Sequence, residues 1–164
     1  MRTIKTIAAL ACILLVSCHS QPTTSVEKIE VLKKQVQSDA KALQDLDDTY
    51  FPKLQQDFLY CDSLLQYLPA EQVDADFAQL NLAQAYMGQF GDVKPMMQHK
   101  MDYLLLQLDR LKSDAESHYL SDSLVLVYLE TEQRVADTIH AQLEYFQTRL
   151  QGSEETFDKL KKSN

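Results

Sequence analysis

The sequence predicts an all-α fold, a bundle of about five helices whose last two form an antiparallel hairpin. Apolar residues recur at spacings of three and four across residues 26–152, and no stretch shows the alternation of a half-buried strand. The 164-residue chain contains only three Gly and four Pro, which favours a few long elements over many short strands. Apolar residues make up 45% of the chain, enough for the core of one globular domain.

The N-terminus has the layout of an export signal. Arg2 and Lys5 give a positive start, and residues 7–16 form an unbroken apolar run. This run is too short for a helix that spans a bilayer, which needs about 20 residues. We therefore interpret residues 1–17 as a signal peptide rather than a transmembrane anchor.

The end of this signal carries a second feature, because Leu15, Val16 and Ser17 lead directly into Cys18. The ending resembles the lipobox of bacterial lipoproteins, which implies cleavage before Cys18 and a diacylglycerol on its thiol. Cys18 is thus the predicted lipidation site, and its acyl chains would anchor the protein to a membrane. A plain secretory signal with a chance cysteine is the alternative.

Residues 18–25 are predicted to be a lipidated tether, because they are polar after Cys18 and contain Pro22. No acidic cluster follows Cys18, although such clusters are common in surface-exported lipoproteins of the Bacteroidetes. His19 also differs from the Asp that resembles an inner-membrane retention signal in enteric bacteria. We therefore expect the outer membrane as the location, with the body facing the periplasm.

The predicted helical bundle domain occupies residues 26–152, and its first three helices end at helix-breaking residues. The first begins at Val26 and ends or kinks at Pro52, which lacks an amide donor. The second ends at Pro69, which also suits the first turn of the next helix. The third runs to Gly88 and Gly91, which we expect to unwind it into a loop.

The last two helices have the clearest limits. The fourth begins near Asp92 and Pro95, and its regular apolar seam ends at His118. The fifth begins a few residues later, and Gly152 is placed to cap its C-terminus. Since the connection is so short, these two helices should pack as an antiparallel hairpin. Residues 153–164 are predicted to be a polar C-terminal tail.

Charge and cysteine content argue against a nucleic-acid-binding protein and against a disulfide-stabilised scaffold. The net charge is −8, and two of the positive charges belong to the signal, so the mature chain is more acidic still and nucleic acid is not an expected partner. Cys12 lies in the signal and Cys18 at its end, which leaves Cys61 alone in the body and excludes a disulfide framework. Cys61 lies on an apolar seam, so we expect it to be buried and unreactive.

One cluster of soft metal ligands surrounds His99, which lies between Met97 and Met101. Thioethers together with an imidazole suit copper. Helical spacing instead puts the two methionines in the core and the histidine on the surface. We therefore expect no metal site there.

A second cluster consists of Asp137, His140 and Glu144, which share one polar helix face. Carboxylate-bridged metal sites in bundles need paired motifs on two helices, and only one helix carries such a set here. A solvated, salt-bridged surface is the expected role. The sequence thus predicts no metal, no cofactor and no catalytic residue.

Residues 45–53 (DLDDTYFPK) form an acidic run followed by apolar residues, Pro and Lys. With residues 86–90 and 103–104, they resemble segments of small helical Bacteroidetes lipoproteins labelled viral A-type inclusion proteins, whose function is unknown. That family usually has a His where Asp47 stands. The resemblance implies a helical envelope lipoprotein and supplies no mechanism.

These observations predict a cell-envelope lipoprotein that is not an enzyme and whose body is a protein-binding or structural module. Its expected partners are the membrane, through the anchor at Cys18, and another envelope protein. No nucleophile elbow, phosphate loop or metalloprotease motif is present. The chain has eight Tyr and no Trp, and Tyr suits protein interfaces. The alternative is a periplasmic bundle that binds a small ligand or a metal.

Overall fold

The computed structural model describes residues 24–67 and 70–163, which are almost entirely helical. The elements are α1 (Ser25–Asp45), a π-helical turn η1 (Leu46–Tyr50), α2 (Phe51–Leu65), α3 (Ala70–Glu116) and α4 (Asp122–Ser163). The all-α prediction is confirmed, and the described residues contain no strand.

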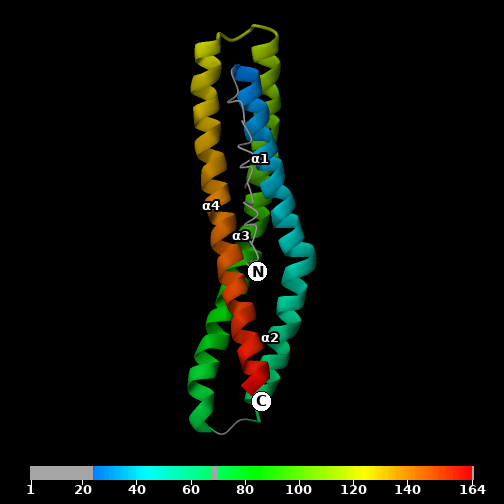
Figure 1. Ribbon diagram of the computed structural model, residues 1–164, viewed down its shortest axis with the longest axis vertical. Helices are drawn as coiled ribbons and strands as arrows, with labels where there is room; N and C mark the ends of the chain where they lie inside the picture. Colours follow the sequence, from blue (N-terminus) through cyan, green and yellow to red (C-terminus); the bar gives the residue numbers. More distant parts are fainter. Residues whose placement is uncertain (1–23, 68–69, 164) are drawn as a thin grey trace, which may run out of the picture.

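Three long helical rods pack side by side in a bundle (Figure 1). The first rod is α1, η1 and α2 end to end, and α3 and α4 are the other two. Residues 117–121 turn the chain from α3 into α4, which run antiparallel in extensive contact, as the hairpin prediction stated. With 47 residues, α3 is about 70 Å long at 1.5 Å per residue.

The expected loop between the third and fourth helices is wrong, because α3 continues through Gly88, Gly91 and Pro95. An internal proline costs a helix about 3 kcal/mol relative to alanine. Packing of the residues before and after Pro95 offsets this cost, because Phe90 and Met97 are fully buried. Tertiary packing of this kind, rather than propensity, supplies most helix stability.

Pro52 bends the first rod without ending it. Its missing N–H and its ring are incompatible with a regular helical bond to the carbonyl one turn back. The backbone widens into η1 just before it, where the Phe51 N–H reaches the Leu46 carbonyl across five residues. This π-type turn accommodates the ring of Pro52 without ending the helix. The predicted first and second helices therefore form one bent rod, and the bundle has three rods instead of five helices.

The C-terminal end also differs from the prediction. Gly152 does not cap α4, which continues to Ser163. Phe157 is completely buried and Leu160 is 4% exposed. The Ser153 hydroxyl donates a hydrogen bond to the Arg149 carbonyl within the same helix. The expected polar tail is therefore a helical part of the bundle.

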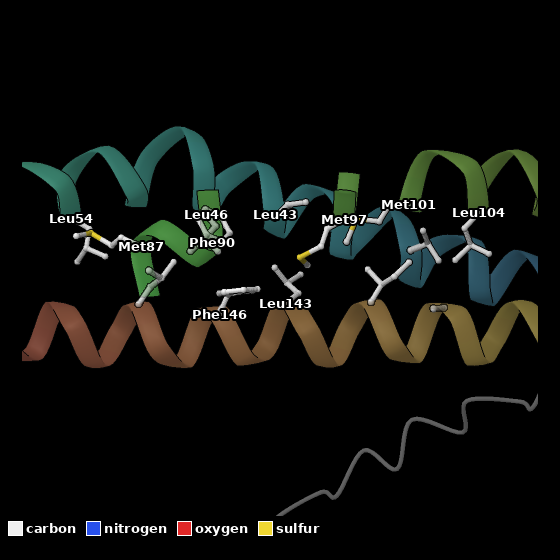
Figure 2. Packing of buried hydrophobic residues seen from close by; sticks show 14 of the residues in the cluster. Leu43, Leu46, Leu54, Met87, Phe90, Met97, Met101, Leu104, Leu143 and Phe146 are labelled. Atoms are coloured by element: carbon white, nitrogen blue, oxygen red, sulfur yellow. The ribbon is translucent and has the colours of Figure 1, made fainter. Parts of the chain in front are cut away.

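A single apolar core runs the length of the bundle. Figure 2 shows its middle, where Met97 and Met101 from α3 lie near Leu43 of α1 and Leu143 of α4. Both methionines are fully buried, as their seam positions predicted. An aromatic layer joins all three rods, since the Phe90 ring lies 5.2 Å from that of Phe51 and 5.6 Å from that of Phe146.

Candidate functional site

The predicted lipidation site, Cys18, and the signal before it lie outside the described residues, which hold only the helical body. Among the described residues, no helix combines the length and apolar character needed to cross a bilayer.

An apolar groove runs between α2 and α3, with a volume of about 570 Å³. Phe51 and Phe58 are half-buried along its α2 side, and Leu59 stands at its rim with 65% of its surface exposed. Its lining contains no charged side chain and consists of Phe51, Gln55, Phe58, Leu59, Gln84, Met87, Gly88 and Gly91. An uncharged aromatic groove is notable on a chain in which 24% of the residues are charged.

Two glycines keep the α3 side of this groove open. Both Gly88 and Gly91 are helical, and a Cβ added at either position would meet nothing within 4 Å. Packing inside the chain therefore does not require glycine there, although each costs helix stability of about 1 kcal/mol relative to alanine. The sequence reasoning missed this groove because it interpreted the two glycines as a loop.

The aromatic rings at the groove are fixed by the core behind them. Phe51 contacts Phe90 of α3, and the ring of Phe58 lies 6.2 Å from that of Phe157 of α4. The bend at η1 is tied to α4 as well, because the Tyr50 hydroxyl donates to Glu154 at 2.6 Å. Burial and this hydrogen bond raise the pKa of Tyr50, so it stays a neutral donor. The groove is therefore a preformed surface.

A second, polar cavity of about 830 Å³ lies between α1 and α3. His99 lines it, and so do the amide side chains of Gln37, Gln44 and Gln98. Lys94 closes one part of it by an ion pair with Asp47 at 2.7 Å. The arrangement offers hydrogen-bond donors and acceptors from two helices.

His140 was expected only on a solvated helix face, but the structure also gives it a partner on another helix. Its Nδ1 lies 2.9 Å from Oδ1 of Asp39 on α1, and its Nε2 lies 3.5 Å from Glu144. The hydrogen bond with Asp39 raises the pKa of His140, while partial burial opposes it. Asp39 is the one polar residue on the buried seam of α1, and its partner 101 residues away explains this position.

The remaining candidates lie apart. His99 is exposed, and Met97 and Met101 are buried beneath it. His118 does not lie on the α3 seam as expected but is exposed in the turn, with a φ of 56°. In the described part of the chain, no three His, Cys, Asp or Glu side chains are placed to hold one metal ion.

Cys61 is completely buried, as predicted. Its thiol lies 3.6 Å from the Phe157 carbonyl. Burial raises the pKa of this thiol, which disfavours the thiolate that a nucleophile needs. Its position therefore suits packing between α2 and α4.

Comparison with known proteins adds no relative: no family model matches the chain, and no match was found among curated proteins or solved structures.

Proposed function

We propose that this protein is a cell-envelope lipoprotein, anchored at Cys18, whose helical body binds a protein partner without catalysing a reaction. The lipobox-like ending at Cys18 supports the anchor. The observation that carries the binding role is the apolar groove between α2 and α3. A partner helix with an apolar face suits such a groove, as in other helix-in-groove complexes.

The chemistry of the groove favours a protein over a small molecule. Its rim residue Leu59 is largely exposed, so the groove is a surface rather than an enclosed pocket. Aromatic side chains are enriched at protein interfaces, where charged residues are depleted from the centre. The open face beside Gly88 and Gly91 also permits close approach of a partner backbone.

Site-specific photo-crosslinking tests the binding role. A benzophenone amino acid at Leu59 in the full chain, expressed in its native envelope, should yield a discrete crosslinked protein. The control is the same amino acid at Gln56, which is exposed on α2 but does not line the groove. Equal products from both positions, or none from Leu59, would contradict the proposal.

Metabolic labelling tests the anchor separately. The wild-type chain should incorporate labelled palmitate and sediment with membranes, whereas Cys18→Ser should do neither. Labelling and sedimentation that survive this substitution would show that the anchor is elsewhere.

The polar cavity between α1 and α3 favours the alternative role, binding of a small polar ligand. Such a ligand would use the amides of Gln44 and Gln98. A ligand of the native state raises the melting temperature by mass action. A ligand-induced rise in melting temperature would support this alternative if it is lost in Gln98→Leu and kept in the variant that carries benzophenone at Leu59.

A further inference from the structure

The first helix begins beside the turn between α3 and α4. Thr24 caps α1 by accepting from the Glu27 N–H, and the Glu27 carboxylate accepts from the Thr24 N–H in return. The Ser25 hydroxyl then donates to the Asp122 carboxylate at 2.9 Å, at the first residue of α4. The start of the folded body is therefore fixed to this end of the bundle (Figure 1).

The position of α1 limits how the body can face a membrane. Six residues separate Cys18 from Ser25, and a chain of that length spans at most about 25 Å. The start of α3 at Ala70 is about 70 Å away along that helix. If Cys18 carries the lipid, as the proposed function states, the turn between α3 and α4 is the end held near the bilayer.

This same end has the composition of a membrane-contacting surface. Residues 117–128 contain one charged residue, Asp122, whose carboxylate accepts from Ser25. Tyr119 is 81% exposed at the turn. Three further apolar side chains are exposed on one side of the first two turns of α4, namely Leu124, Val127 and Tyr128. Tyrosine prefers the headgroup level of a bilayer, where its ring is shielded and its hydroxyl stays solvated.

The backbone of the turn is locked. Tyr119 N–H donates to the Asp114 carbonyl at 2.9 Å and His118 N–H donates to the Ala115 carbonyl at 3.2 Å. These are the two bonds of a Schellman motif, with His118 in the left-handed position that glycine usually takes. The Tyr119 side chain thus projects from an ordered turn.

We propose that the α3–α4 turn rests on the surface of the phospholipid bilayer, with Tyr119 at the headgroup level. This inference rests on lipidation at Cys18 and adds an orientation to it. The bundle stands away from the bilayer, and the opposite end, where Tyr67 is 86% exposed, points into the compartment.

Tryptophan fluorescence tests this orientation cleanly, because the chain contains no Trp. The mature chain lipidated at Cys18 is reconstituted into phosphatidylcholine vesicles whose acyl chains are brominated near the headgroup. Tyr119→Trp should lose much of its emission to bromine quenching and shift to the blue. Tyr67→Trp, at the opposite end, should keep the emission that it shows in unbrominated vesicles.

Two failures are distinguishable. Palmitate incorporation without quenching of the Tyr119→Trp variant, or with equal quenching of the Tyr119→Trp and Tyr67→Trp variants, would overturn the orientation and leave the lipoprotein proposal intact. Absence of palmitate would overturn the anchor and the orientation together.

Discussion

Asp39 of α1 and His140 of α4 form a hydrogen-bonded pair, with 2.9 Å between Oδ1 and Nδ1, at a position where the α1 seam is otherwise apolar. The Asp39 side chain is only 10% exposed, whereas the His140 side chain is 44% exposed. The pair thus joins a buried carboxylate to a solvent-facing imidazole.

Removing the imidazole should destabilise the bundle more than removing the carboxylate. His140→Ala takes a partner from a buried carboxylate, which costs about 1 to 3 kcal/mol. Asp39→Leu fills the seam with an apolar side chain, a change that is often neutral or stabilising. Urea denaturation measures both, and His140→Ala should cost little once Asp39 is Leu. An unchanged cost in that background would show that the pair is not coupled.

The same pair predicts a pH dependence of stability. The pKa of His140 is raised in the folded chain, mainly by the hydrogen bond with Asp39. The protonated form therefore adds stability that is complete below the unfolded value of about 6.5 and is lost as the pH rises through the raised folded value. Between mildly acidic and alkaline pH, the free energy of unfolding should fall more for wild type than for His140→Gln. Parallel pH profiles would contradict this.

The turn before α4 should be stabilised by glycine. His118 adopts a φ of 56°, where a side chain costs about 1 to 2 kcal/mol and glycine does not. His118→Gly should therefore raise the melting temperature, as differential scanning calorimetry would record. Ser117→Gly, just before it with no positive φ, should lower it or leave it unchanged. A fall for His118→Gly would mean that its imidazole stabilises the turn.

Phe157 should be among the most costly residues to truncate, although it follows the expected end of the domain. It is completely buried and its ring packs against Phe58 of α2. Phe157→Ala should lower the free energy of unfolding by about 3 to 5 kcal/mol. Lys159→Ala, two residues later and exposed, is the matched control and should change it little. Similar effects of the two in chemical denaturation would contradict the structure.

The sequence predicted which residues are buried better than it predicted where helices end. The three-four spacing identified Met97 and Met101 as core residues, because burial on one helix face leaves a local pattern. The predicted unwinding at Gly88, helix start near Pro95 and helix end at Gly152 are wrong, because propensity is local whereas the packing that overrides it comes from other helices.

The candidate sites depended on distant pairings that a local pattern does not contain. Asp39 and His140 are 101 residues apart in sequence. The groove exists only because α2 and the first half of α3 lie beside each other. The sequence pattern therefore could not show that Phe58 and Gly88 line one groove.

The glycines of the groove give the prediction that best separates stability from function. Since a Cβ at Gly88, Gly91 or Gly152 meets nothing within 4 Å, alanine at each position should stabilise the helix by about 0.5 to 1 kcal/mol. Thermal denaturation should show a higher melting temperature for all three variants. Only the first two line the groove, whereas Gly152 lies in α4 beyond it.

Partner binding should respond differently to the same three changes. A methyl group at Gly88 or Gly91 enters the space that a partner backbone would occupy, so crosslinking from Leu59 should fall although the fold is more stable. Gly152→Ala should leave that crosslinking unchanged. If all three variants crosslink as wild type does, the glycines are not part of the binding surface. If all three lose stability, α3 and α4 are strained at these positions and the open space beside them has a structural origin.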